Sequence, residues 1–234
     1  MFLAEVFGTM TLIVLGDGVV ANVLLNKSKG QNSGWIVITA GWAFAVMSGI
    51  FVSVAMGGPG SLNPAFQVAS MVTGGNFNAA LMNLLGEFVG AFVGAVLVWL
   101  LYMPHWEVTS DAGLKLAVFS TGPAIRNPGL NLLTEIIATF MLGLIATAVG
   151  KASAVAGMSP LLVGAVIWGL GLSLGGPTGY ALNPARDLGP RIAHAVLPIA
   201  GKGSSDWGYS WVPVVGPIVG AVLAAFVTAA IFVK

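Results

Sequence analysis

The chain has 234 residues, of which 57% are hydrophobic and only 7% are charged, and its formal net charge is +1. Soluble domains carry roughly 25% charged residues, so this composition excludes a water-soluble globular protein. The small net charge argues against a nucleic-acid partner. The absence of cysteine excludes disulfide bonds, thiolate catalysis and a cysteine-ligated metal.

The apolar segments, taken in chain order, predict an all-α membrane protein with six transmembrane helices. They are expected at about residues 2–25, 35–56, 81–102, 132–150, 160–174 and 212–233. A bilayer span needs about 20 apolar residues, and these six are the long apolar segments of the chain. Two further segments, at about residues 64–73 and 184–195, are too short to cross and are expected to be half-helices. The polar stretches at residues 104–131 and 201–209 are expected to be loops.

Each half-helix is preceded by the same tripeptide, Asn63-Pro64-Ala65 in the first half and Asn183-Pro184-Ala185 in the second. Asn is a preferred N-cap, and Pro is pre-organised for the first helical position. The two tripeptides therefore predict two helices that start inside the membrane at matching places. A broken helix in each half of a membrane protein indicates a site near the bilayer midplane.

The two halves of the chain are an internal repeat. Residues 4–9 match residues 134–139, and residues 86–91 match residues 216–221. The repeats are expected at about residues 1–103 and 131–234, joined by a connecting loop at about residues 104–130. Because each repeat holds three spans, the second repeat must enter the membrane from the opposite side. This inverted repeat brings the N-termini of the two half-helices together.

The paired tripeptides, the arginine that follows the second one and the repeated intramembrane glutamate resemble the aquaporin or major intrinsic protein family, over essentially the whole chain. Residues 183–191 and 15–22 are similar to its glycerol-facilitator branch. The resemblance implies one channel domain over residues 1–234, a homotetramer with one pore per subunit, and no cofactor. It also implies a cell-membrane location with both termini in the cytoplasm. With both termini in the cytoplasm, most basic residues would lie on the outer side. The positive-inside rule therefore favours the reverse orientation.

The two asparagines suggest how such a pore excludes ions. An N-cap Asn accepts a backbone N–H with its side-chain oxygen, which leaves its NH₂ group to point into the pore. Each half-helix also has a partial positive charge at its N-terminus. Asn63 and Asn183 are thus expected to donate hydrogen bonds at the same depth and to repel cations. The alternative is that both residues act only as helix caps.

The resemblance places a selectivity filter at Trp42, Gly171, Tyr180 and Arg186. Trp42 and Tyr180 would contact the carbon backbone of a polyol, Arg186 would bind its hydroxyls, and Gly171 would leave room where water-selective members have histidine. Tyr180 stands where a close glycerol facilitator has phenylalanine. Two alternatives remain, namely that Trp42 is a lipid-interface anchor and that Arg186 pairs with Asp187.

Several other polar residues lie inside or beside the predicted spans. Glu5 and Glu135 are expected either to accept backbone N–H groups of the re-entrant loops or to relay protons. Asp187 is expected to complement the first turn of its helix and to support the loop around Arg186. Glu87 has no counterpart in the second half and no predicted role, and no metal or catalytic site can be built from His105 and His194.

A second departure from the family pattern lies just before the first tripeptide, where members usually have a histidine two residues before the Asn and this chain has Ser61. Its backbone carbonyl would still line the pore. The predicted function is a passive channel for glycerol and other small neutral solutes plus water. A strict water channel, a secondary transporter and an intramembrane enzyme are the alternatives, and the choice among polyols, dihydroxyacetone, urea and undissociated small acids stays open.

Overall fold

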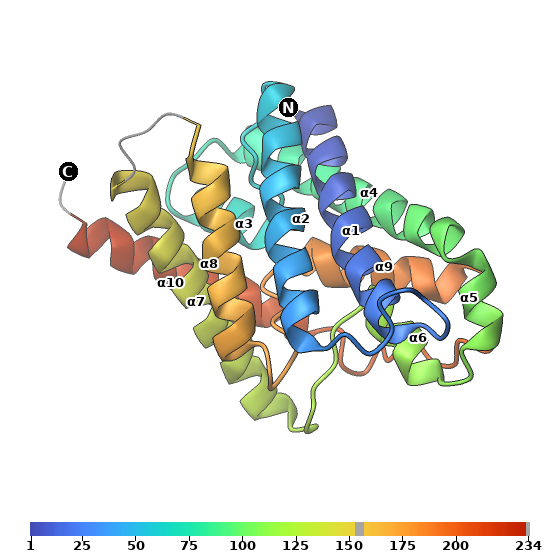
Figure 1. The fold of residues 1–234 in the computed structure, drawn as a ribbon. Coiled ribbons are helices and arrows are strands. Elements are labelled where there is room, and N and C mark those ends of the chain that lie inside the picture. Colours follow the sequence, from blue (N-terminus) through green and yellow to red (C-terminus); the bar gives the residue numbers. More distant parts are fainter. Residues whose placement is uncertain (153–156, 233–234) are drawn as a thin grey trace.

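The computed structural model describes residues 1–152 and 157–232, and within this part of the chain all regular structure is helical (Figure 1). The ten helices are α1 (Phe2–Leu24), α2 (Trp35–Ala55), α3 (Pro64–Val72), α4 (Phe77–Leu101), α5 (Met103–Val108), α6 (Ala112–Phe119), α7 (Pro128–Ala152), α8 (Ser159–Leu174), α9 (Pro184–Val196) and α10 (Val212–Ile231).

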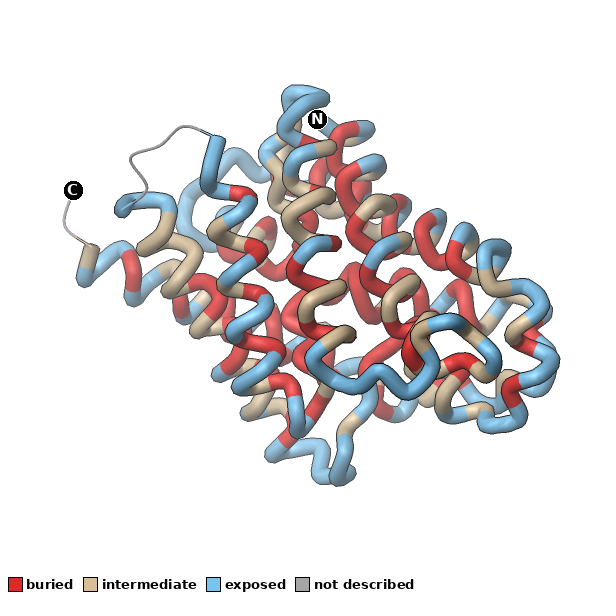
Figure 2. Tube along the Cα trace, viewed as in Figure 1, coloured by how far each residue is buried: buried red, intermediate tan, exposed pale blue. Residues whose placement is uncertain are grey.

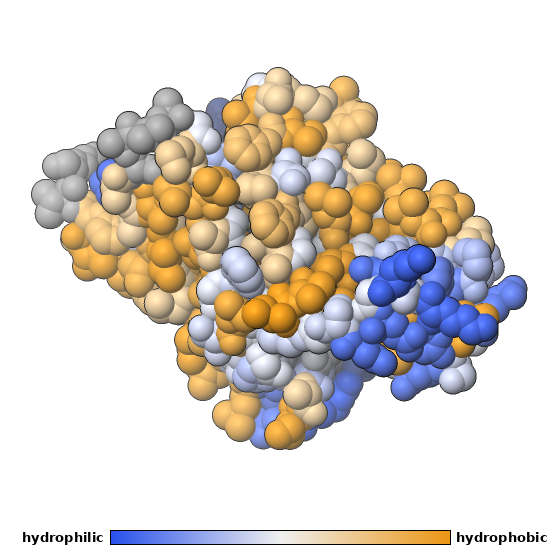
Figure 3. Space-filling view, in the orientation of Figure 1, coloured by the Kyte–Doolittle hydropathy of each residue, from blue (hydrophilic) through white to orange (hydrophobic). Residues whose placement is uncertain are grey.

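The six spanning helices are α1, α2, α4, α7, α8 and α10, as the sequence predicts. Five of them are long and apolar enough to cross a membrane, and α8 is a shorter apolar helix of 16 residues. Among the five long helices, α1 has the largest buried share (Figure 2). Figure 3 shows a mostly hydrophobic face, on which hydrophilic residues gather at the end formed by α5, α6 and the loop after α1.

The two halves pack in the same way. The contact of α1 with α4 in the first half is repeated by α7 with α10 in the second, and the half-helices cross over, since α3 packs on α10 and α9 packs on α4. Matching glycines allow these close approaches. A methyl group at Gly90 would clash with the carbonyl oxygen of Val6, and one at the matching Gly220 would lie 2.5 Å from that of Ile136.

The predicted loop at residues 104–131 is wrong in part, because most of α5, all of α6 and the first four residues of α7, which begins at Pro128, fall within it. Asp111 caps α6, and its Oδ1 accepts the N–H groups of Gly113 at 2.7 Å and Leu114 at 3.2 Å. The N-cap pattern was visible in the sequence, but the polar composition of the stretch concealed it. Helix α4 also begins at Phe77, four residues before the predicted start, since Asn76 caps it.

Candidate pore and its constriction

The two half-helices meet at their N-termini through a reciprocal pair of hydrogen bonds. The side-chain amide of Asn63 donates to the carbonyl oxygen of Leu182 at 2.8 Å, and that of Asn183 donates to the carbonyl oxygen of Leu62 at 2.6 Å. Each half-helix therefore holds the loop that precedes the other. The inverted repeat brings together two asparagines that are 120 residues apart in the chain.

Both asparagines are also helix caps, as expected. The Oδ1 atom of Asn63 accepts the N–H of Ala65 at 3.0 Å, and that of Asn183 accepts the N–H of Ala185 at 2.9 Å and of Arg186 at 3.2 Å. From the sequence alone, the whole NH₂ group of each asparagine is expected to be available to the pore. In the structure one N–H of each amide is used by the opposite loop, and the second hydrogen is left for another acceptor. Pro64 and Pro184 take the first helical position.

The loops before the asparagines contain strained backbone at matching places. Leu62 has φ of +55° and Leu182 has φ of +56°, in the left-handed region that β- and γ-branched side chains rarely adopt. This conformation turns their carbonyl oxygens toward the opposite asparagine. Such strain costs of order 1–3 kcal/mol per residue and persists only where surrounding contacts hold it.

The buried glutamates supply those contacts. Glu5 Oε2 accepts the N–H of Leu62 at 2.7 Å, and Glu135 Oε2 accepts the N–H of Leu182 at 3.0 Å. The other oxygen of Glu5 accepts from Gly60 N at 3.1 Å, while that of Glu135 accepts from Ala181 N at 3.0 Å. These are the hydrogen bonds to backbone N–H groups of the re-entrant loops that we expect from the sequence as one of the two alternatives for Glu5 and Glu135.

Each glutamate also has a hydroxyl partner that the sequence analysis missed. Ser53 Oγ donates to Glu5 and Thr178 Oγ1 donates to Glu135, both at 2.6 Å. Every carboxylate oxygen of the pair thus accepts at least one hydrogen bond. A proton relay needs a carboxylate that can exchange its proton with the pore, and these two lie fully behind the loops.

Glu87 on α4 is hydrogen-bonded to the first half-helix. Its Oε1 accepts a hydrogen bond from Gln67 Nε2 of α3 at 2.9 Å, and both side chains are buried. This bond ties α3 to α4. In the second half Pro217 stands at the matching position, which explains why the repeat comparison gave Glu87 no role.

Three of the four predicted filter residues come together in the structure. The guanidinium carbon of Arg186 lies 3.9 Å from the centre of the Trp42 ring, a cation–π arrangement. Trp42, Tyr180 and Arg186 line both a cavity of about 410 Å³ and a second cavity of about 230 Å³. These three residues therefore lie where the two cavities meet, and we call them the arginine constriction.

Gly171 does not line either cavity, because the ring of Tyr180 covers it. The room that Gly171 leaves is occupied by the ring of Tyr180. Trp35 encloses the same corner, since its Nε1 donates to the Gly171 carbonyl at 3.0 Å and its ring meets that of Tyr180 edge-on at 5.9 Å. The Tyr180 hydroxyl is buried and has no hydrogen-bond partner among the described residues.

Both alternatives for the filter residues are contradicted. Trp42 is 5% exposed and its ring packs on Gly16 of α1, so it is not a lipid-interface anchor. Arg186 pairs with Asp17 on α1, where Nη1 lies 3.5 Å from Oδ1, and not with Asp187. The same nitrogen lies 3.4 Å from the carbonyl oxygen of Phe119.

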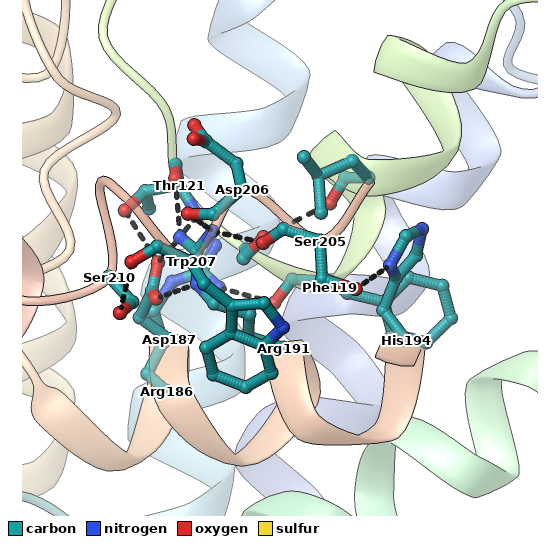
Figure 4. A network of polar contacts seen from close by, with 12 residues as sticks. Phe119, Thr121, Arg186, Asp187, Arg191, His194, Ser205, Asp206, Trp207 and Ser210 are labelled. Atoms are coloured by element: carbon teal, nitrogen blue, oxygen red, sulfur yellow. Dashed lines mark hydrogen bonds and ion pairs between the residues drawn. The ribbon is translucent and has the colours of Figure 1, made fainter. Parts of the chain in front are cut away.

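Asp187 belongs to a buried polar network that lies beside the constriction (Figure 4). Its Oδ1 accepts from Arg191 Nε at 2.8 Å, and its Oδ2 accepts from the N–H and the hydroxyl of Thr121 at 2.7 and 2.8 Å. Arg191 also donates to the carbonyl oxygens of Thr121 at 2.9 Å and Ser205 at 2.7 Å. Asp187 thus supports the segment that follows Phe119, a contact that was not among its expected roles at the first turn of its helix and in the loop around Arg186.

The remaining polar groups of the described residues offer no metal site. Residues 1–152 and 157–232 contain no group of three or more histidine, aspartate or glutamate side chains placed to hold an ion. His194 Nδ1 lies 2.8 Å from the Ser205 hydroxyl and its ring packs on Phe119, so it belongs to the wall of the network. Ser61 lines the larger cavity.

Comparisons with known proteins agree with this architecture. The family model described as "Major intrinsic protein" matches residues 1–228. The chain is 55% identical over 225 residues to a probable glycerol uptake facilitator protein of Thermotoga maritima, covering 96% of each chain, and 52% identical over 224 residues to a glycerol uptake facilitator protein of Streptococcus pneumoniae, covering 95% of each.

The fold also matches a solved structure. The aquaglyceroporin from Plasmodium falciparum superposes with a TM-score of 0.86 and 28% identity, over 99% of this chain and 95% of that chain. The chain thus matches known proteins in sequence across nearly its whole length and matches a solved structure in its fold. This chain belongs to the major intrinsic protein family.

Proposed function

We propose that this chain forms a passive transmembrane channel for glycerol and other small neutral solutes plus water, and that it excludes protons and ions. The observation that carries the proposal is the reciprocal pairing of Asn63 with Leu182 and of Asn183 with Leu62, which sets two amide donors at the wall of one cavity. The similarity to glycerol uptake facilitators supports the choice of solute.

The two asparagines would orient each solute at the centre of the pore. Each amide keeps one hydrogen for a water or hydroxyl oxygen, and each half-helix adds a partial positive charge at its N-terminus. A water bound there presents its oxygen to both donors and its hydrogens outward, so hydrogen-bonded water on either side is oriented in opposite senses. A proton or metal ion meets a positive field without a compensating acceptor.

The arginine constriction would select by chemistry and size. Trp42 and Tyr180 offer apolar ring surface for a carbon backbone, and Arg186 offers donors for hydroxyl oxygens. A polyol has a carbon backbone for the ring surface and hydroxyl oxygens for the donors. Water can use only the donors. Gly171 contributes indirectly, since it leaves room for the Tyr180 ring beside the pore.

The alternatives are less well supported. A secondary transporter needs a coupling-ion site, and Glu5 and Glu135 already accept hydrogen bonds on every carboxylate oxygen. A strict water channel would not need the aromatic corner formed by Trp42 and Tyr180. The chain belongs to a family whose listed relatives are facilitators. We assign no catalytic residue and no cofactor to it.

We further propose a homotetramer in the cell membrane with one pore in each subunit and both termini in the cytoplasm, as the family resemblance implies. One channel domain would cover residues 1–234, with repeats at about residues 1–103 and 131–234. The apolar surface of the bundle supports burial against lipid and against neighbouring subunits (Figure 3).

Stopped-flow light scattering on proteoliposomes tests the proposed function. The purified chain should raise the permeability to glycerol and to water above that of protein-free liposomes, without raising potassium or proton leak. A series that includes urea and an uncharged weak acid would rank the neutral solutes. Water permeability without glycerol permeability would establish a strict water channel instead.

A further inference from the structure

We propose that Asp17 is a positioning residue for the arginine constriction, which holds the Arg186 guanidinium against α1 and cancels its charge. In this account the constriction discriminates by hydroxyl groups and shape, because it presents no net charge to attract anions or cations. The inference rests on the proposed channel function and deepens it by naming the residue that leaves the arginine constriction without a net charge.

The first observation is the position of Asp17. It lies on α1 with 0% of its surface exposed, and it lines neither of the two cavities. It therefore touches no solute and acts only through Arg186, whose Nη1 lies 3.5 Å from its Oδ1. The second carboxylate oxygen has no hydrogen-bond partner among the described residues, so the guanidinium is the main group that compensates the charge of this aspartate.

The second observation is the way in which Arg186 is held. Both of its acceptors, the carboxylate of Asp17 and the carbonyl of Phe119, contact the same nitrogen, Nη1. The described residues thus leave the rest of the planar guanidinium, which carries five N–H donors in total, for hydroxyl groups in the pore. The Trp42 ring packs against the guanidinium.

The third observation is that two neighbouring residues of α1 support two walls of the constriction. The absent side chain of Gly16 makes room for the Trp42 ring, and the carboxylate of Asp17 holds the guanidinium. Gly16 and Asp17, two residues of the run 15–22 that is similar to the glycerol-facilitator branch, therefore have a physical role in the pore although both are buried behind it.

The fourth observation is the charge balance. Four buried charged residues surround the constriction, and they form two separate pairs, Asp17 with Arg186 and Asp187 with Arg191. The charges sum to zero. Because a buried charge interacts strongly in a medium of low dielectric constant, removing either member of the first pair should leave a net charge that acts directly on ions in the pore.

A double-mutant cycle on ion leak tests this inference. Arg186→Gln leaves Asp17 without a counter-charge and should raise potassium leak by about tenfold. Asp17→Asn keeps an oxygen for Nη1 but leaves the positive charge of Arg186 unbalanced, so it should raise chloride leak by about tenfold. The double variant carries neither charge and should return both leaks to within about twofold of the wild type. Proteoliposomes loaded with potassium chloride give both rates.

Glu107→Gln is the matched control. It removes one exposed carboxylate to which no role in the pore is assigned, so it should change neither leak. Equal leak in the single and double variants, or no change in the Asp17→Asn variant, would overturn the inference. If a single variant does not fold, thermal unfolding of the double variant decides. The double variant should fold again, since no unpaired buried charge remains. A double variant that also does not fold would overturn the inference. Glycerol flux of the wild type in the same vesicles tests the proposed function separately.

Discussion

The ring of Tyr180 covers Gly171 so closely that a methyl group at position 171 would lie 2.7 Å from its Cζ and 2.8 Å from its hydroxyl oxygen. Tyr180 reaches this place from a backbone with φ of +40°, on the loop that leads into α9. The wall of the constriction is therefore formed by a loop residue that rests on a glycine of α8. A change at either residue should move the other.

Gly171→Ala should lower glycerol permeability more than water permeability. The added methyl group cannot be accommodated at 2.7 Å, so the Tyr180 ring must shift toward the pore and narrow it for the larger solute. Gly169→Ala is the control, because the same methyl group at Gly169 meets nothing within 4 Å. Equal slowing of glycerol and water in the Gly171→Ala variant would show that Tyr180 does not border the narrowest part.

Tyr180→Phe should leave glycerol permeability within about twofold of the wild type and should not lower thermal stability, because a buried hydroxyl without a partner contributes no hydrogen bond to lose. That hydroxyl is buried against Gly171 and lacks a partner among the described residues. Stopped-flow permeability and the midpoint of thermal unfolding give the two values. A large fall in glycerol flux would mean that the hydroxyl contacts the solute.

The local signals in the sequence account for a large part of this site. Asn followed by Pro identified both caps, and the repeat comparison paired Glu5 with Glu135 and so predicted the backbone bonds of the two loops. Both inferences need only neighbouring residues or an alignment of the two halves. The six spans follow in the same way, because their apolar length is a local property.

The contacts that could not be predicted from the sequence are those between residues far apart in the chain or set by an unusual loop conformation. Asp17 and Arg186 are 169 residues apart, and nothing near either residue shows that helices α1 and α9 bring them together. The cover that Tyr180 forms over Gly171 depends on a loop conformation that the residue types do not favour. Helices α5 and α6 were missed because they are short and lie in a polar stretch, where composition outweighed the Asp111 cap of α6 and α5 has no side-chain cap.

Glu135→Gln should lower the free energy of unfolding in detergent by about 2 kcal/mol, because hydrogen bonds to a charged acceptor become weaker and an amide can turn its NH₂ group toward backbone donors. The bonds affected are those from Thr178, Ala181 and Leu182. Glycerol uptake by the wild type should not depend on a proton gradient. A gradient-dependent uptake that this variant abolishes would favour the proton-relay reading instead.

His194 predicts how stability changes with pH. Burial and the nearby positive charges of Lys202 and Arg191 lower the pKa of His194 from 6.5 to about 4. The unfolded chain therefore binds a proton more readily than the folded one, and the stability contributed by neutral His194 is complete above about pH 6.5 and is lost as the pH falls toward 4. Unfolding of the His194→Gln variant should lose this pH dependence, and an unchanged slope would assign it to other groups.

The dependence of glycerol uptake on glycerol concentration tests the central claim most directly. In proteoliposomes with all ion gradients collapsed, a passive pore predicts that the initial uptake rate rises in proportion to glycerol concentration over the whole accessible range. The rate should stay well above that of protein-free vesicles. Saturation at low glycerol concentration, or uptake that requires an ion gradient, would contradict the channel account.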